Sequence, residues 1–455
     1  MNLTTTLAFR ESTWNELTKW LDNPLETAGV LTARVVNDDD GLTLLVRDLH
    51  EASIDSYIER RKDRLSLSSG GWITAVRGSR DDDAMSIFVH SHPDGPAIFS
   101  EADDEVDNEL RQAFFEHSGY PMFGSLVIAG SKASPEFAGR LESPNADEYK
   151  IDVVRVVGDR LLILRNDDIA EATPQFDRQV RALGIEGQST IRNLRVGIVG
   201  AGGTGSAIVE QLIRLGVGNL VIVDDDLVTP ATIARGYGSR RDDIGKTKVE
   251  LLARLAGQVN IDTQVDSVFG NIQNEMVALR LRHCDVIFCC ADSHGARIVL
   301  NRMAYTLLCP VIDVAILISS SDKKVTGIDG RVTWLAPGTS CLLCRNRIDA
   351  VLANAESLDP LERRRLAGQG YVPEIEDPQP SVVPYTTLMA SFAVTELLNR
   401  LFGFSSVEPT EVIVRLLDRH ISVNRVPARV GCFCDDRAFL GRAKEAPFLG
   451  IAWVK

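Results

Sequence analysis

The chain has 455 residues, of which 44% are hydrophobic and 25% charged, an ordinary composition for a folded protein of two or three domains. Its net charge of −14, without a concentrated basic run, argues against nucleic acid or an anionic membrane as the main partner. The first residues do not form a secretory signal, and no apolar run approaches the ~20 residues of a membrane span. We therefore expect a cytoplasmic protein whose eight cysteines are reduced thiols or metal ligands rather than disulfides.

The first third of the chain carries histidines and an acid at metal-binding spacing. His90 and His92 lie in SIFVHSHPDG, which begins as a strand, and residues two apart on a strand share a face. Ser100 and Asp103 open a predicted helix in which Asp103 faces the buried side, one turn before Val106. A helix cap explains Ser100 and Asp103 but not the two histidines. Two histidines and one carboxylate form a catalytic zinc set that leaves a position for water.

This cluster resembles the JAMM (JAB/MPN) zinc isopeptidase motif: His-x-His, seven residues, Ser, two residues and Asp. Glu26, in Glu-Thr-Ala-Gly-Val-Leu, resembles the glutamate that this family carries upstream. The resemblance implies an α/β metalloprotease domain over residues 1–165, with Zn²⁺ on His90, His92 and Asp103. It further implies that Glu26 is the acid/base, that Ser100 steadies the oxyanion, and that cleavage follows the C-terminal glycine of a ubiquitin-like protein.

A polar segment at residues 165–178 suits a linker, so we place a domain boundary near residue 165 and a second domain at 166–455. Residues 194–200 predict a buried strand, followed by a glycine turn with Gly200, Gly202 and Gly205 and a helix from Ser206 to about residue 215. Phosphates are expected at the start of such a helix. A second strand ends at Asp224, at the offset where an acid contacts a ribose. By itself this unit fits a NAD(P)-binding oxidoreductase equally well.

The charged residues that follow favour adenylation over hydride transfer. Asp224 and Asp226 precede Arg235 and Lys248, and Asp292 follows a third predicted strand. Adenylation brings a carboxylate against an α-phosphate, so Mg²⁺, Arg and Lys must offset the charge of two anions. A hydride-transfer enzyme needs no such set of cations and acids.

Residues 175–435 resemble the ThiF/MoeB and ubiquitin-activating family, with Phe-Asp-Arg178-Gln and a later Gly-Gln matching the helix before its nucleotide strand. The resemblance implies a Rossmann-like adenylation domain with a mainly parallel sheet, and a homodimer in which Arg178 reaches the partner's ATP site. It also implies that Asp224 holds the ribose, that Arg235 and Lys248 contact ATP phosphates, and that Asp292 coordinates Mg²⁺. Asp226 joins this nucleotide-binding set. The family's asparagine before the arginine is Thr232 here, whose shorter reach predicts slower or differently tuned adenylation.

The cysteines form two groups. Cys341, Cys344, Cys432 and Cys434 resemble the family's structural zinc ligands, although the second pair is spaced C-x-C in place of C-x-x-C. Cys284, Cys289, Cys290 and Cys309 are expected to be small core residues. Residues 345–431 contain no cysteine, so we predict an acyl-adenylate without a conventional thioester on this chain. A Pro-rich stretch at residues 372–384 predicts a long loop.

These observations favour a bifunctional enzyme of a bacterial ubiquitin-like conjugation or sulfur-carrier pathway, using ATP, Mg²⁺ and Zn²⁺. Its expected partners are a ubiquitin-like or sulfur-carrier protein ending in glycine, and a separate conjugating or sulfur-donor protein. Two alternatives stay open: a NAD(P)-binding oxidoreductase with an unrelated metal domain, and a non-catalytic scaffold that binds a ubiquitin-like protein. The sequence does not say whether cleavage prepares or reverses activation.

Overall fold

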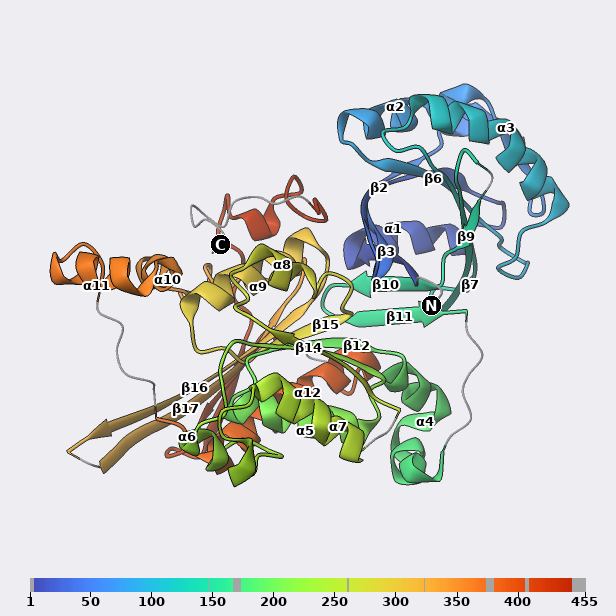
Figure 1. The fold of residues 1–455 in the computed structure, drawn as a ribbon. Helices are drawn as coiled ribbons and strands as arrows, with labels where there is room; N and C mark the ends of the chain where they lie inside the picture. The colour runs from blue at the N-terminus through green and yellow to red at the C-terminus, as the bar shows by residue number, and fades with distance from the viewer. Residues whose placement is uncertain are drawn as a thin grey trace. The chain divides into compact units, whose positions relative to one another are not determined.

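The computed structural model describes residues 4–145, 147–166, 173–259, 262–322, 324–373, 380–405 and 409–443. The chain divides into two compact units: unit 1 is Met1–Asp168 with Leu440–Ala443, and unit 2 is Ile169–Phe439 with Lys444–Lys455 (Figure 1). Parts of the predicted linker (167–172) and of the predicted Pro-rich loop (374–379) lie outside the described residues. Within the described ranges, no helix is both long and apolar enough to cross a membrane.

Unit 1 is built on a nine-stranded sheet in the order β11-β10-β1-β3-β2-β6-β7-β8-β9. Its strands are β1 (Thr5–Arg10), β2 (Ala28–Asp38), β3 (Gly41–Glu51), β6 (Met85–Ser91), β7 (Phe123–Ser131), β8 (Ser134–Glu142), β9 (Glu148–Lys150), β10 (Val153–Val157) and β11 (Leu161–Arg165). A separate hairpin joins β4 (Tyr57–Arg60) and β5 (Leu65–Leu67), and the helices are α1 (Glu11–Thr18), α2 (Ile73–Asp81) and α3 (Glu101–His117).

Helices cover both faces of the unit 1 sheet, and every residue of its central strand β6 is buried. Trp14 and Leu17 of α1 pack in one core cluster with Leu31 of β2. On the other face, Val76 of α2 and Phe114 of α3 pack in a second cluster with β2 and β6 residues. Such a sheet needs nearly continuous hydrophobic strands, and polar residues within it therefore require a specific partner.

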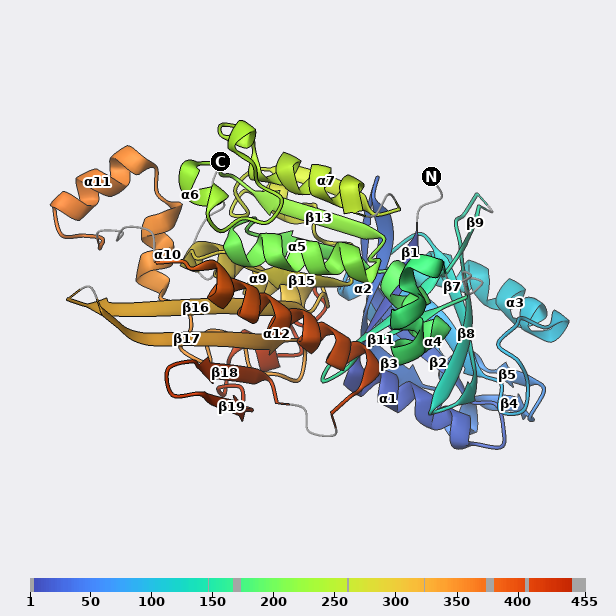
Figure 2. The same cartoon turned by 90° about the horizontal axis from the view of Figure 1, so that it is seen from below.

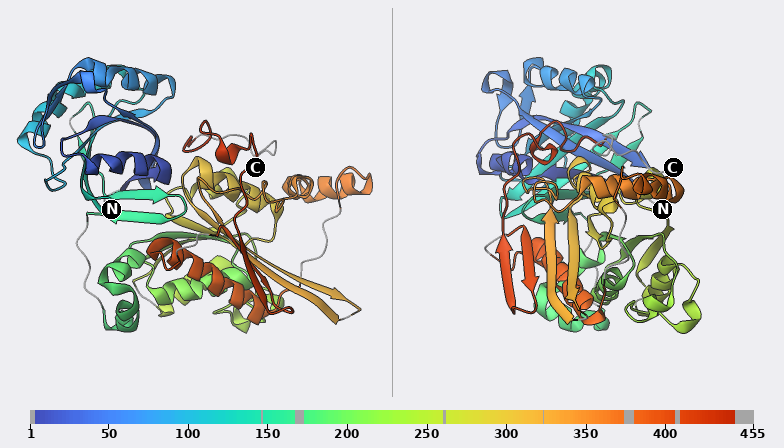
Figure 3. Two further views of the ribbon diagram at one scale, coloured as in Figure 1. Left: turned by 180° about the vertical axis from the view of Figure 1, so that it is seen from behind. Right: turned by 90° about the vertical axis from the view of Figure 1, so that its left-hand side faces the viewer.

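Unit 2 contains an eight-stranded sheet in the order β14-β13-β12-β15-β16-β17-β18-β19. Its strands are β12 (Arg195–Val199), β13 (Asn219–Asp224), β14 (Gln264–Phe269), β15 (Val286–Cys289), β16 (Val311–Ser321), β17 (Lys324–Leu335), β18 (Glu411–Arg415) and β19 (His420–Asn424). The strands from β14 to β16 pair in parallel, and β17 to β19 are antiparallel, as expected for a mainly parallel Rossmann-like sheet. The β16–β17 hairpin extends beyond the shorter strands (Figure 3).

Helices also cover both faces of the unit 2 sheet, with α5, α7 and α12 together on one of them (Figure 2). The helices are α4 (Asp177–Arg192), α5 (Gly203–Leu215), α6 (Pro230–Ile233), α7 (Lys248–Val259), α8 (Glu275–Leu279), α9 (His294–Thr306), α10 (Ala350–Ser357), α11 (Pro360–Gly368) and α12 (Val383–Phe402). The strand order reverses at β12, which pairs with β13 on one side and β15 on the other. In doubly wound sheets, a reversal of this kind leaves a ligand-binding crevice at the carboxyl ends of the strands.

Candidate functional site

A compact cluster of side chains that could hold a metal ion lies in unit 1, where β6 ends and α3 begins. Nε2 of His90 lies 2.9 Å from Oδ1 of Asp103, and Nε2 of His92 lies 3.5 Å from Oδ2 of Asp103. The two Nε2 atoms are 3.1 Å apart, and all three residues offer ligand atoms within 4.8 Å of one another. Two imidazoles and one carboxylate, all buried, are the donor set of a zinc site with a position left open. These residues therefore fit the predicted metal.

Neighbouring groups orient these ligands. Nδ1 of His92 lies 3.0 Å from the carbonyl oxygen of Pro96; donation from Nδ1 to that oxygen leaves Nε2 free to bind a metal. Ser100 caps α3, and its backbone N and Oγ each donate to Oδ2 of Asp103 at 2.7 Å. The Asp103 carboxylate thus completes the predicted helix cap and is also the predicted metal ligand. The hydroxyl expected to steady an oxyanion is directed at Asp103 in this structure.

Glu26 lies beside the cluster, immediately before β2. Its Oε1 is 3.8 Å from Nε2 of His92, and the residue is only 3% exposed. Burial raises the pKa of Glu26 to about 7, against the opposing effect of His90 and His92. Burial also acts to raise the pKa of Asp103, but hydrogen bonds with the two histidines hold it well below its usual range. A carboxyl group with a pKa near neutrality is suited to accept and return a proton.

The β4–β5 hairpin holds the backbone around Glu26, an arrangement that sequence reasoning did not find. Arg60 donates from Nε to the carbonyl oxygen of Glu26 and from Nη2 to Oγ1 of Thr27, both at 2.8 Å. The Arg60 guanidinium stacks on the ring of Tyr57, 4.6 Å from its centroid, and the Tyr57 hydroxyl accepts from the Ala28 N–H at 2.9 Å. The sequence signal for this arrangement was weak: it consisted of the basic residues gathered in the hairpin, which do not show what Arg60 contacts.

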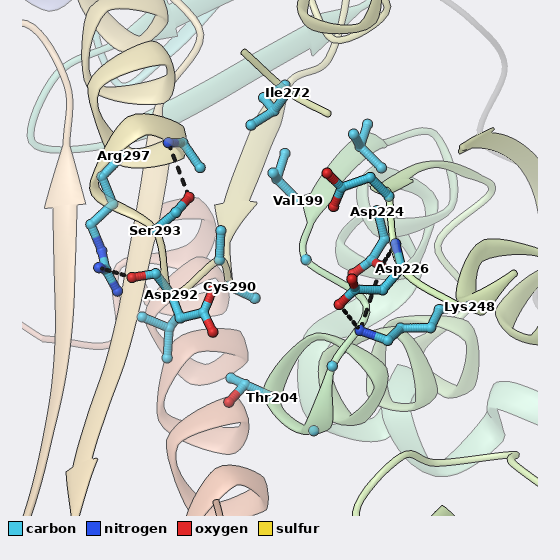
Figure 4. Close-up of a pocket in the computed structure, with 18 of the residues that line it drawn as sticks. Val199, Thr204, Asp224, Asp226, Lys248, Ile272, Cys290, Asp292, Ser293 and Arg297 are labelled. Carbon is cyan, nitrogen blue, oxygen red and sulfur yellow. Dashed lines mark hydrogen bonds and ion pairs between the residues drawn. The ribbon is translucent and has the colours of Figure 1, made fainter. Parts of the chain in front are cut away.

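Unit 2 contains a polar cavity of about 380 Å³ at the carboxyl ends of β12, β13 and β15. It brings together seven of the residues predicted to bind nucleotide: Gly200, Gly202, Asp224, Asp226, Arg235, Lys248 and Asp292. Figure 4 shows Asp224, Asp226 and Lys248 on one side of this cavity and Asp292 with Arg297 on the other. Arg297, Asn271 and Glu356 also line the cavity, although no sequence motif pointed to them.

The three predicted glycines serve different purposes in the turn. Gly200 has a φ of 95°, a conformation that side chains disfavour. A Cβ on Gly205 would lie 1.8 Å from the carbonyl oxygen of Gly200, so this position lets α5 pack against the turn. A Cβ on Gly202 would meet nothing within 4 Å, which leaves the backbone open to a ligand. Helix α5 begins at Gly203, three residues earlier than predicted, because Gly203 to Gly205 adopt helical conformations.

Asp224 and Lys248 are fixed in place before any nucleotide arrives. Asp224 accepts hydrogen bonds from the N–H groups of Ala201 at 2.6 Å and Asp226 at 2.9 Å. Nζ of Lys248 lies 2.6 Å from Oδ2 of Asp226 and 3.6 Å from Oδ1 of Asp224. Burial raises the pKa of Asp224, and the charge of Lys248 opposes that shift. Nucleotide phosphates would therefore compete with Asp226 for Lys248.

Asp292 is exposed in the cavity, and within the described parts of the chain no hydrogen bond or ion pair holds its carboxylate. A free carboxylate facing a phosphate-sized cavity suits Mg²⁺, which binds through one or two carboxylates and substrate phosphates. Thr232 is absent from the cavity lining: it forms a capping box with Thr229 at the start of α6 and is buried. Arg178 is exposed on α4 and does not line the cavity of its own chain.

Cysteines from two distant segments meet in unit 2. Sγ of Cys341 lies 3.6 Å from Sγ of Cys432, and Sγ of Cys344 lies 3.8 Å from Sγ of Cys434. Zinc–sulfur bonds of about 2.3 Å in a tetrahedron place the sulfurs roughly 3.8 Å apart, so all four residues fit Zn²⁺ despite the C-x-C spacing. Of the remaining cysteines, Cys284, Cys289 and Cys309 are buried as expected. Cys290 instead is half-buried and lines the cavity, because β15 ends one residue before it.

Comparison with known proteins supports both halves of this description. Residues 176–431 match the ThiF family, and residues 17–140 match the family of prokaryotic homologs of the JAB domain. The SAMP-activating enzyme E1 of Haloferax volcanii is 31% identical over 175 residues, which cover 37% of this chain and 62% of that enzyme. The sulfur carrier protein ThiS adenylyltransferase of Bacillus subtilis is 27% identical over 282 residues, covering 61% of this chain and 74% of that protein. The crystal structure of E. coli MccB is 16% identical with a TM-score of 0.47, covering 60% of this chain and 76% of that one. The chain thus spans less than two thirds of the Haloferax relative.

Proposed function

The ThiF match spans more than half of the chain, so this protein belongs to the ThiF family, and on that premise we propose that unit 2 adenylates the C-terminal glycine of a ubiquitin-like or sulfur-carrier protein. The observation that carries the proposal is one cavity whose lining includes the glycine turn, Lys248, Arg235 and Asp292. The names of two relatives, the SAMP-activating enzyme and the ThiS adenylyltransferase, support this class of substrate. The JAB domain in unit 1 is proposed to act as a zinc peptidase on the same class of protein.

In the proposed reaction, a terminal carboxylate oxygen attacks the α-phosphorus of ATP, and the bond from that phosphorus to pyrophosphate breaks. Asp224 would hold the ribose, and N–H groups at the start of α5 would hold phosphate oxygens. Lys248 and Arg235 offset the charge where two anions meet. Mg²⁺ held by Asp292 would supply further neutralisation of the phosphates.

We further propose that the enzyme is a homodimer in which Arg178 completes the site of the partner subunit. Arg178 is exposed and does not line its own cavity, which is compatible with a role in trans. Residues 345–431 contain no cysteine to accept the acyl group, so the adenylate is proposed to pass to a separate acceptor. A conjugate between the two proteins that is sensitive to reductant and lost on mutation of one cysteine would contradict this.

In unit 1, His90, His92 and Asp103 would hold Zn²⁺, which supplies Lewis-acid activation of water and of the scissile carbonyl. Glu26 would accept a proton from the attacking water and return it to the leaving amine, since its pKa lies near neutrality. Ser100 would either orient Asp103, as it does here, or turn toward the oxyanion.

The adenylation proposal is tested first with nucleotides alone. Isothermal titration calorimetry should show binding of ATP and none of NAD⁺; the reverse result would support the oxidoreductase alternative. Exchange of labelled pyrophosphate into ATP should then depend on an added carrier, for which the Bacillus subtilis sulfur carrier ThiS is the first probe. The same carrier without its last residue is the control, and Lys248→Ala should abolish exchange.

The peptidase proposal needs a separate substrate. ThiS extended by a short C-terminal peptide should be cleaved after its original last residue, as mass spectrometry would show. Glu26→Gln should abolish cleavage while leaving zinc bound, because Glu26 is not one of the three clustered ligands. Cleavage by Glu26→Gln at the wild-type rate would refute the assigned role. Exchange without cleavage would point instead to a non-catalytic JAB domain.

A further inference from the structure

A buried guanidinium bridges two strands beside the nucleotide cavity. Arg297, on the first turn of α9, is 9% exposed. Its Nε donates to Oδ1 of Asp313 at 3.1 Å, and its Nη1 donates to the backbone carbonyl oxygen of Asp292 at 3.0 Å. One planar group therefore ties a carboxylate on β16 to the segment that follows β15. Figure 4 shows Arg297 reaching Asp292 from α9.

The anchor of this bridge is completely buried. Asp313 on β16 has no exposed surface. It pairs with Cys289, the last residue of the neighbouring parallel strand β15, and Cys289 lies three residues before Asp292 in the sequence. Its second oxygen, Oδ2, accepts from Nη2 of Arg331 at 2.6 Å. A buried carboxylate is retained only when its charge is paired and its lone pairs are satisfied. Both oxygens of Asp313 are satisfied, one by a residue that reaches the cavity lining and one by a residue outside it.

Asp292 needs such an anchor in its backbone, because no hydrogen bond or ion pair among the described residues holds its side chain. The position of its carboxylate therefore depends on the backbone that carries it. Arg297 donates to the carbonyl oxygen of Asp292 itself, between Cys290, whose N–H donates to Val199, and Ser293, which caps α9. A lysine at 297 would keep the charge opposite Asp313, but a single ammonium lacks the fork that reaches two acceptors in different directions.

We propose that Arg297 and Asp313 are positioning residues that hold the Asp292 segment in the geometry that binds ATP together with Mg²⁺. The proposal rests on the proposed adenylation function. It assigns Arg297 to the protein's own backbone and not to a phosphate. Arg331 contacts the other oxygen of the same carboxylate and so helps to hold Asp313, but it does not line the cavity, and a lysine at 331 would keep its charge beside Asp313.

The test compares Arg297→Lys with the matched control Arg331→Lys in the full-length protein. Calorimetry measures the dissociation constant of ATP with Mg²⁺ and with EDTA, and melting temperatures confirm that each variant is folded. With Mg²⁺, Arg297→Lys should raise the ATP dissociation constant roughly tenfold, which corresponds to the loss of one charge-assisted hydrogen bond. With EDTA, the dissociation constant should stay within about twofold of the wild-type value. Arg331→Lys should match the wild type in both conditions. Asp313→Asn removes the carboxylate that anchors Arg297 and leaves Arg297 in place. It should reproduce the result of Arg297→Lys: weaker ATP binding with Mg²⁺ and little change with EDTA.

Three results would overturn the proposal: equal behaviour of the two lysine variants, no loss of ATP affinity in Arg297→Lys in either condition, or an equal loss of affinity with and without Mg²⁺. The last would place Arg297 directly on a phosphate. Failure of the underlying function has a different signature, because the wild-type protein would then bind no ATP in either condition. If Arg297→Lys melts far below the wild type, Asp313→Asn decides the question by the same two constants.

Discussion

Replacing Gly205 by alanine should destabilise unit 2, whereas replacing Gly202 by alanine should weaken ATP binding at unchanged stability. The new Cβ at 205 would lie 1.8 Å from the Gly200 carbonyl oxygen, although real Cβ atoms essentially never approach closer than 3.0 Å. The turn must therefore move by about 1.2 Å. Because that neighbour is backbone, the cost is at the upper end of overpacking, about 3 kcal/mol. The higher helix propensity of alanine returns about 1 kcal/mol, which leaves a net loss of about 2 kcal/mol.

Differential scanning calorimetry of the full-length protein measures this loss. For a unit of this size, about 2 kcal/mol lowers the melting temperature by roughly 3–4 °C. Gly202→Ala is the matched control, because its Cβ meets nothing within 4 Å and its φ of −75° suits any residue. Its methyl group instead occupies space at the cavity, so the ATP dissociation constant should rise. Unchanged melting of Gly205→Ala, or a loss of stability in Gly202→Ala, would refute the assigned packing.

Three further predictions follow from the sites. Thr232→Ala should cost about 1 kcal/mol of stability because it removes the α6 capping box, but calorimetry should find ATP affinity unchanged; a weaker affinity would mean that the hydroxyl contacts nucleotide. Arg60→Ala should lower cleavage of the extended ThiS probe roughly tenfold at unchanged zinc content, because Arg60 holds the Glu26 backbone and no zinc ligand; loss of zinc would contradict this. Cys344→Ser should remove about one equivalent of zinc and lower the melting temperature of unit 2. His90→Ala should remove the other equivalent and leave the melting temperature of unit 2 unchanged. Mass spectrometry of the bound metal measures the zinc content of each variant.

The sequence by itself determined the features whose geometry is local. His90 and His92 are two residues apart near a strand end, and Ser100 and Asp103 share the first turn of a helix, so short-range periodicity brings each pair together. The glycine turn is equally local, and its strand–turn–helix order predicted a phosphate site at the start of α5, where the cavity lies. The mainly parallel sheet of unit 2 was expected from the resemblance to the ThiF/MoeB family, and the observed strand order agrees with it.

Tertiary structure alone decided the contacts between distant segments. Glu26 reaches the histidines because β2 pairs with β6, with Ala28 opposite His90, and the hairpin carrying Arg60 closes over it. Asp313 meets Arg297 through the parallel pairing of β15 and β16 and the packing of α9. Strand order and the burial of charge depend on the whole chain, and local patterns of hydrophobicity do not encode them. The same holds for Thr232: its motif position pointed to the nucleotide, but the nearer hydrogen-bond partner at the start of α6 holds its side chain.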